Sequence, residues 1–203
     1  MRILKAALAD IEEVAELHVQ AFPGFFLTSL GVPFLKELYA GFLSHSSGIF
    51  LVAKEEGLIV GFVAGTSSPK VFFSDLRRGR CIAFFIKAIP SIFRNPLPVC
   101  KKLFYAATYR GDAPVANPSA ALLSSIGTSH SCRGTGVASS LMIEFENEAM
   151  KHGAGHVFLT TDASDNDRVN AFYRKQGYEI VTSFQQNGGR DMFRYEKPLS
   201  ARI

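Results

Sequence analysis

A short glycine-containing segment, Arg133–Ala138 with the sequence RGTGVA, carries the residue types and spacing most directly tied to chemistry. It follows an apolar run over residues 121–126 and precedes a stretch with apolar residues at helical spacing. This order predicts a glycine-rich turn at the N-terminus of a helix. Unpaired backbone N–H groups and the positive end of the helix dipole favour anions at such a turn. The segment therefore predicts a phosphate-binding site.

Two common phosphate-binding motifs do not fit this segment. It is too short for Gly-x-x-x-x-Gly-Lys-Ser/Thr, the loop of many nucleotide hydrolases. It also lacks the Gly-x-Gly-x-x-Gly of dinucleotide-binding folds.

Length and composition indicate an ordinary globular protein. The 203 residues fit one domain, with 47% hydrophobic and 20% charged residues. We expect a cytoplasmic protein, because the N-terminus does not read as a signal peptide and no apolar run reaches about 18 residues. The three widely spaced cysteines are typical of free thiols and show no metal-ligand spacing, so we expect no metal.

The element order predicts a mixed α/β fold. Apolar periodicity favours strands at residues 2–7, 49–53, 58–64, 121–128, 156–161, 178–184 and 192–196. Helical spacing and end signals favour helices that begin near residue 10 and at residues 32–43, 134–152 and 166–176. Gly127 within a strand predicts a bulge or a close backbone approach.

Residues 70–115 interrupt this regular order and read as a helical insertion before the fourth strand. Nine basic side chains and one acidic side chain give residues 70–110 a charge of +8, against −4 for the rest of the chain. Pro90, Pro96 and Pro98 predict that the segment is divided into short helices. Three interpretations stay open: a lid over a phosphorylated or acidic acceptor, peripheral contact with an anionic membrane, or a flank that packs its Phe residues on the core. No nucleic-acid motif is present, so we expect no such partner.

Two blocks together resemble the GCN5-related N-acetyltransferase (GNAT) superfamily. Arg133–Ala138 matches its Gln/Arg-x-x-Gly-x-Gly/Ala pattern. About 30 residues later, a second block has Asn166 at the start of a helix, Tyr173 seven residues on, and Gly177-Tyr178 at the end. Val169 stands where Ala is usual. The resemblance covers residues 119–199 well and residues 1–69 loosely, and it implies one GNAT domain over residues 1–203 with a mostly antiparallel twisted sheet and flanking helices.

The resemblance implies that the chain binds acetyl-CoA. Loop amides would bind the pyrophosphate, and the strand before the loop would separate from its neighbour and expose its backbone to the pantetheine arm. The implied cofactor-binding residues are Ile126, Gly127, Thr128, Arg133, Gly134, Thr135, Gly136, Val137, Ala138, Ser139, Asn166 and Tyr173.

Tyr173 is the best catalytic candidate, because a phenol with a pKa of about 10 can protonate a departing thiolate at neutral pH. Its alternative is a core aromatic residue, and the alternative for Asn166 is a plain helix cap. The strand 121–129 has no Asp or Glu that could act as a base. His130 lies at its end and is the candidate base; its alternative is a polar loop residue. Cys132 reads as a small buried residue.

These residues predict an N-acetyltransferase in which a primary amine attacks acetyl-CoA directly. We expect the acceptor to be a small amine such as an amino sugar, anionic or phosphorylated. Whether the protein forms a homodimer stays open. The alternatives are a non-catalytic module that binds CoA or a partner, and an enzyme that acetylates protein N-termini or lysines.

Overall fold

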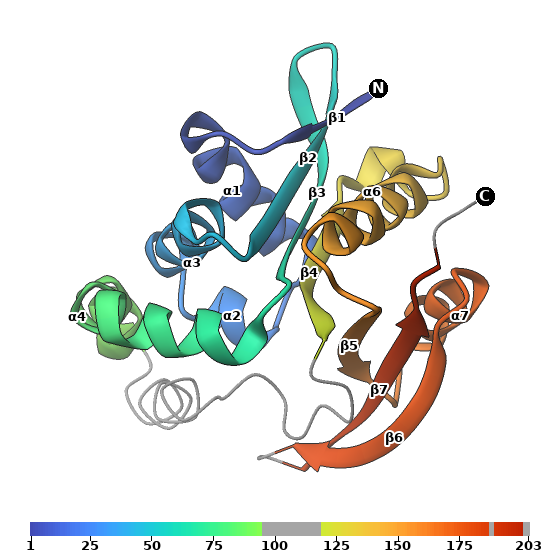
Figure 1. Ribbon diagram of the computed structural model, residues 1–203. Helices are drawn as coiled ribbons and strands as arrows, with labels where there is room; N and C mark the ends of the chain where they lie inside the picture. The colour runs from blue at the N-terminus through green and yellow to red at the C-terminus, as the bar shows by residue number, and fades with distance from the viewer. Residues whose placement is uncertain (95–118, 187–188, 201–203) are drawn as a thin grey trace.

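A seven-stranded sheet forms the centre of the protein, with the strand order β1-β2-β3-β4-β5-β7-β6 (Figure 1). The computed structural model describes residues 1–94, 119–186 and 189–200. Only the β4–β5 pair is parallel; the other neighbours are antiparallel. The strands are β1 (Arg2–Lys5), β2 (Gly48–Glu55), β3 (Leu58–Thr66), β4 (Ala120–Thr128), β5 (His156–Asp162), β6 (Glu179–Gln186) and β7 (Arg190–Pro198).

Helices cover both faces of the sheet. The α-helices are α1 (Ile11–Ala21), α2 (Phe26–Ser29), α3 (Val32–Ser44), α4 (Pro69–Arg94), α6 (Val137–Lys151) and α7 (Asp167–Lys175). Two short 3-10 helices, η1 (Leu8–Asp10) and η2 (His130–Cys132), precede α1 and the loop before α6. Figure 1 shows α1, α3 and α4 on one side of the sheet and α6 and α7 on the other. The predicted fold class and element order are confirmed; the short α2 was not predicted.

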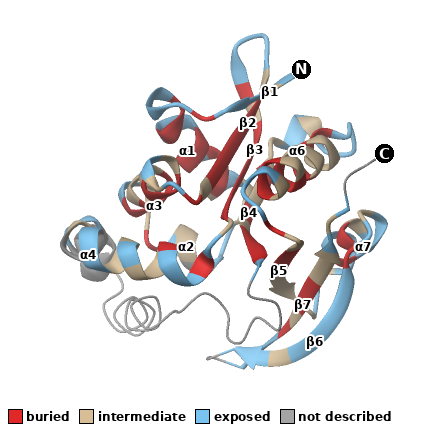
Figure 2. Cartoon of the chain, in the orientation of Figure 1, coloured by how far each residue is buried: buried red, intermediate tan, exposed pale blue. Residues whose placement is uncertain are grey.

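Each face of the sheet has its own hydrophobic core. On the α6 face, Leu141 and Phe145 pack with Val63, Leu123 and Leu159, all buried. On the other face, residues of α1 and α3 pack with inward-facing residues of β2 and β3 and with Phe72 of α4. The burial pattern in Figure 2 follows this arrangement, with buried strands in the middle and an exposed β6 at one edge. The α6 face and the face with α1, α3 and α4 are therefore two separate environments along the same strands.

The inserted segment begins as one long helix. α4 continues through Pro90 to Arg94, so the prediction that Pro90 divides it is wrong. A proline removes one backbone hydrogen bond and can bend a helix without ending it. Phe72 stacks on Phe42 of α3 with ring centroids 4.5 Å apart, so α4 packs its aromatic residues on the core. Pro96, Pro98 and the rest of the insertion to residue 115 lie outside the described residues.

None of the helices in the described ranges is long and apolar enough to span a membrane.

Gly65 of β3 allows α6 to approach the sheet closely. A Cβ atom at this position would lie 2.1 Å from the Leu122 carbonyl oxygen and 2.7 Å from the Phe145 ring. A backbone carbonyl in a sheet cannot move aside cheaply, so Phe145 and β4 would both have to shift. The glycine thus determines how closely α6 packs over the β3–β4 ladder.

We predict that Gly65→Ala lowers the free energy of unfolding by about 1–3 kcal/mol, because it overpacks this contact. Gly79→Ala is the matched control, since nothing lies within 4 Å of a Cβ atom at that exposed helical position. The control should gain up to about 1 kcal/mol from helix propensity. Urea denaturation followed by circular dichroism measures both changes. Equal effects of the two substitutions would contradict the role given to Gly65.

Candidate functional site

The N-terminus of α6 offers free backbone N–H groups. Gly134 and Gly136 both have positive φ, 80° and 92°, which glycine adopts without strain. The first intrahelical bond is donated by the Ser140 amide to the Gly136 carbonyl, over 3.0 Å. No side chain caps this helix end. The amides of residues 137–139 therefore have no acceptor within the helix and point toward the loop, as an anion site requires.

Contacts within the loop hold its shape. The Thr135 hydroxyl donates to the Cys132 carbonyl over 2.8 Å, and the Gln176 side chain donates to Ser139 Oγ over 3.0 Å. The second contact ties the end of α7 to the start of α6. Cys132 is half-buried and packs against the core of the α6 face, so the prediction of a fully buried residue holds only in part.

β4 and β5 separate soon after they begin to pair. Their register pairs are Ala120–His156, Ala121–Val157 and Leu122–Phe158. Beyond these, β4 continues with β3 to Thr128, whereas β5 continues with β7 to Asp162. We call this opening the fork, between residues 123–128 and residues 159–162, with its apex at Leu122 and Phe158. On the β4 side, backbone groups of residues 123–128 that face the fork lack a strand partner among the described residues, so they can bind an extended ligand.

A bulge and a glycine shape the β4 side of the fork. The register shift between Ala64 and Gly65 leaves Ser124 as the extra residue, so the predicted bulge lies at Ser124 and not at Gly127. The close approach predicted at Gly127 is present, because a Cβ atom there would lie 2.9 Å from the Phe62 ring and 3.2 Å from Ala21 Cβ. Gly65, opposite this bulge, lies too close to the Leu122 carbonyl for a Cβ atom to fit, and a sequence pattern does not reveal this contact.

Tyr173 lies in the hydrophobic core of the α6 face. Its side chain is buried in the cluster that includes Val137 of α6 and Leu159 of β5, with its ring 5.6 Å from that of Tyr195. Burial and the neighbouring Tyr195 raise the pKa of the phenol, which stays protonated at neutral pH. Among the hydrogen bonds of the described residues, none uses its hydroxyl. The hydroxyl is therefore a proton donor without a protein acceptor.

Asn166 and Asn170 attach the start of α7 to the end of β5. Asn166 occupies the cap position, but its amide donates to Thr161 Oγ1 over 2.8 Å and to the Asp162 carbonyl, and it makes no side-chain capping bond. Asn170 is buried, donates to the same carbonyl over 3.2 Å and accepts from the Tyr195 hydroxyl over 3.1 Å. Sequence reasoning missed Asn170, although its place one turn after Asn166 was a usable signal.

His130 is exposed at the start of the loop, and its Nε2 atom is already engaged. Arg133 Nη2 lies 3.2 Å from it, and the Gln20 carbonyl lies 3.4 Å from it. A carbonyl can only accept and an arginine can only donate, so the two contacts require different tautomers: Nε2–H donates to Gln20, or a deprotonated Nε2 accepts from Arg133. In the second tautomer, the bond from Arg133 occupies the Nε2 lone pair that a base would need. The role of His130 as a base stays a prediction, and it requires this hydrogen bond to open.

Polar side chains line the fork on the face opposite α6. Phe158 of β5 packs with Phe73 of α4, so alternation places Thr160 and Asp162 on the face covered by α1, α3 and α4. Arg190 binds Asp162 through Nε and Nη2, over 3.0 and 2.6 Å, and its guanidinium lies 5.4 Å from the Phe25 ring. The segment between α1 and α2 therefore reaches the end of β5 through Arg190.

Two buried side-chain nitrogens in the described residues have no hydrogen-bond partner, His18 Nε2 and Arg194 Nη2. Both lie on this same face. His18 Nδ1 is 2.6 Å from the Tyr39 hydroxyl, which also interacts with Ser125 of β4. Burial lowers the pKa of His18 to about 4, so the imidazole is neutral at neutral pH. Sequence reasoning missed both residues, because nothing local marks them.

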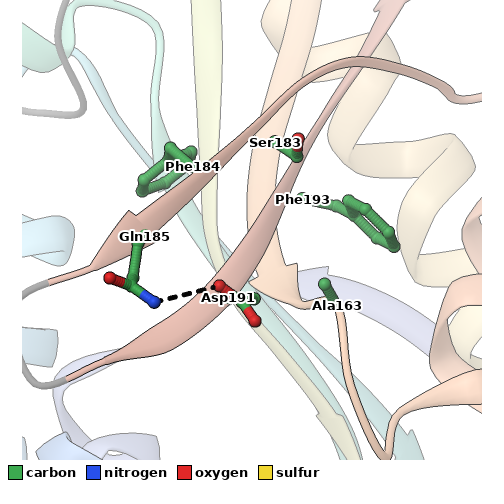
Figure 3. Close-up of a pocket in the computed structure, with 6 residues that line it drawn as sticks. All are labelled: Ala163, Ser183, Phe184, Gln185, Asp191 and Phe193. Carbon is green, nitrogen blue, oxygen red and sulfur yellow. Dashed lines mark hydrogen bonds between the residues drawn. The ribbon is translucent and has the colours of Figure 1, made fainter.

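Two cavities border the ends of the site. One of about 360 Å³ lies beside the β6–β7 ribbon, lined by Ala163, Ser183, Phe184, Gln185, Asp191 and Phe193 (Figure 3). Gln185 there donates to Asp191 over 3.4 Å. The other, of about 500 Å³, lies between the loop before α6 and the β2–β3 hairpin, with Thr135 and Val137 in its wall. Within the described ranges, no group of three or more His, Cys, Asp or Glu is placed to bind a metal.

Comparison with known proteins supports the family suggested by the two sequence blocks. Residues 100–178 match the model of the acetyltransferase (GNAT) family. A comparison with curated proteins gives no match.

Solved structures of acetyltransferases share the fold over nearly the whole chain. A ribosomal-protein-alanine N-acetyltransferase from Brucella melitensis has a TM-score of 0.63 at 16% identity, covering 98% of this chain and 100% of its own. An aminoglycoside 6'-acetyltransferase type Ii has a TM-score of 0.64 at 16% identity, with full coverage of both chains. An aminoglycoside 6'-N-acetyltransferase complexed with coenzyme A has a TM-score of 0.63 at 14% identity, covering 100% of this chain and 99% of its own.

The predicted resemblance is confirmed: residues 100–178 match the GNAT family, and the fold is that of GNAT acetyltransferases.

Proposed function

We propose that this protein is an acetyl-CoA-dependent N-acetyltransferase that transfers the acetyl group to a primary amine. The observation that carries the proposal is the combination of an uncapped α6 N-terminus with the fork beside it. Together they provide an anion site and, next to it, a strand edge with free backbone groups. A donor with a pyrophosphate at one end and an extended, amide-bearing arm at the other fits this combination.

The donor would lie on the α6 side of the fork. The amides of Gly134, Gly136, Val137, Ala138 and Ser139 would bind the pyrophosphate, and the Arg133 guanidinium would add positive charge. The amides of Arg133 and Thr135 donate to the His130 and Cys132 carbonyls over 3.4 Å, and they would join once these long bonds open. Ile126, Gly127 and Thr128 would bind the pantetheine arm through the backbone of the fork edge. Binding of a phosphate to Arg133 would also draw its guanidinium away from His130 Nε2 and free that lone pair.

The acceptor amine would then reach the thioester from the opposite face of the fork. Its nitrogen forms a bond to the carbonyl carbon, the carbon–sulfur bond breaks, and the departing thiolate takes a proton from the Tyr173 hydroxyl. The amine loses its own proton to a base, for which His130 is our candidate. Asn166 would orient the donor from the start of α7. The burial that raises the Tyr173 pKa also keeps the phenol protonated until the thiolate forms.

Gly136→Val should reduce acetyl-CoA affinity at least about tenfold, since a β-branched residue cannot hold the positive φ that aims the helix amides. Isothermal titration calorimetry with acetyl-CoA measures the effect. Gly153→Val is the matched control, because Gly153 has φ of 81° just beyond the other end of the same helix, with nothing within 4 Å of a Cβ atom. Unchanged affinity in Gly136→Val, or an equal loss in both variants, would refute the phosphate assignment.

Tyr173→Phe should lower kcat by about 100-fold or more, while the Kd for acetyl-CoA changes little, because the change removes a proton donor and keeps the ring. Release of free thiol from acetyl-CoA with a panel of primary amines measures the rate. Tyr178→Phe is the matched control, since it removes a buried phenol hydroxyl that bonds to Glu146 at 3.1 Å. Tyr178→Phe should be less stable than the wild type but release thiol at the same rate.

Two outcomes of this assay count against the proposal. Full activity of Tyr173→Phe would return Tyr173 to a purely structural role. Tight binding of acetyl-CoA by the wild type without thiol release for any amine would favour the non-catalytic CoA-binding module instead.

A further inference from the structure

Arg194 of β7 has a hydrogen-bond donor without an acceptor in the described part of the protein. The residue is 4% exposed, and its Nη2 atom is buried without a hydrogen-bond partner. We propose that this guanidinium binds an oxyanion of the acceptor substrate, a carboxylate or a phosphate, at the apex of the fork. The proposal rests on the function proposed above and names the substrate class of that same site.

Two contacts fix the orientation of the guanidinium. Nε donates to Glu196 Oε1 over 2.9 Å, and Cζ lies 4.2 Å from the centre of the Phe158 ring. Glu196 therefore holds one edge of the group, and Phe158 supports one of its flat faces. A buried charged donor without an acceptor is costly, so proteins rarely keep one. An oxyanion that reaches Nη2 would satisfy it with a short, charge-assisted bond.

The position of Arg194 places its Nη2 atom where the acetyl transfer would occur. Phe158, which supports the guanidinium, forms the last β4–β5 register pair with Leu122. Arg194 itself is in register with Thr160, the next residue of β5 on the same face. This is the face covered by α1, α3 and α4, opposite the α6 N-terminus. The guanidinium thus lies at the apex on the side from which the acceptor would approach.

The neighbouring charges favour an anion over a cation. Two carboxylates on this face of the β5–β7 pair, Asp162 and Glu196, are already bound by Arg190 and Arg194. α4, which reaches Phe158 through Phe73, has six basic residues and one acidic residue in its sequence. An acceptor with several positive charges would meet paired carboxylates and a basic helix, whereas an anionic acceptor would meet an unpaired guanidinium nitrogen.

Matched acceptor pairs test the proposal by thiol release from acetyl-CoA. One pair is glucosamine 6-phosphate and glucosamine, and the other is β-alanine and its amide. In at least one pair, the wild type should prefer the anionic member by about tenfold or more in kcat/KM. Arg194→Gln should remove that preference by raising KM for the anionic member, with little change for the uncharged one. The pair that responds identifies phosphate or carboxylate as the recognised group.

Two further variants keep the test decisive. Arg194→Lys retains the positive charge but lacks the planar set of N–H donors, so it should keep part of the preference for the anionic acceptor. It keeps the proposal testable if Arg194→Gln folds poorly. Arg174→Gln removes the same charge from an exposed position on α7 and should leave the preference unchanged.

A binding measurement separates failure of this inference from failure of the proposed function. With CoA present, the preferred anionic acceptor should raise the Tm of the wild type, but not that of Arg194→Gln. Equal Tm shifts in both proteins, or thiol release without any preference in either pair, would overturn the role of Arg194. No thiol release with any amine would instead overturn the proposed function, while an Arg194-dependent Tm shift would still support an anion site.

Discussion

The separation of β4 from β5 is the constraint on which the rest of the site depends. A parallel strand pair normally satisfies the backbone groups along its whole length, but this pair has three register pairs before the strands diverge. Each strand then keeps its other neighbour, so the sheet remains continuous at both sides of the opening. The bulge at Ser124, opposite the closely packed Gly65, accompanies this divergence on the β4 side. The opening is thus part of the sheet's own geometry.

The helices on the α6 face connect the two arms of the fork. Glu146 of α6 is buried and accepts from Tyr178 over 3.1 Å and from Lys197 of β7 over 2.8 Å. Gln176 and Ser139 connect the end of α7 to the start of α6. Because α6 packs on β3 and β4 whereas β7 pairs with β5, these bonds span the fork. They connect the β3–β4 side of the sheet to the β5–β7 side across the opening.

Local signals explain what could be predicted from the sequence. Positive φ at Gly134, Gly136 and Gly177 is a property of single residues, so the loop before α6 and the end of α7 were predictable. Apolar periodicity located the strands and most helices. The prediction at Pro90 was wrong because whether a proline ends a helix depends on the packing around it.

The parts that were missed depend on contacts distant in sequence. The unpaired nitrogen of Arg194 becomes visible only when β7 lies beside β5. The buried pair of His18 and Tyr39, 21 residues apart, likewise forms only when α1 packs against α3. The motifs therefore led to the proposed acetyl-donor site, whereas the proposed acceptor site required the arrangement of the sheet.

The most direct test of the central claim is a ¹H–¹⁵N correlation spectrum of the protein recorded with and without CoA. If the α6 N-terminus and the fork edge hold the pyrophosphate and the pantetheine arm, the largest shift changes should fall on the amides of residues 126–128 and 133–139. If those amides stay unchanged while residues of the β6–β7 ribbon respond, CoA binds elsewhere and the fork is not the donor site.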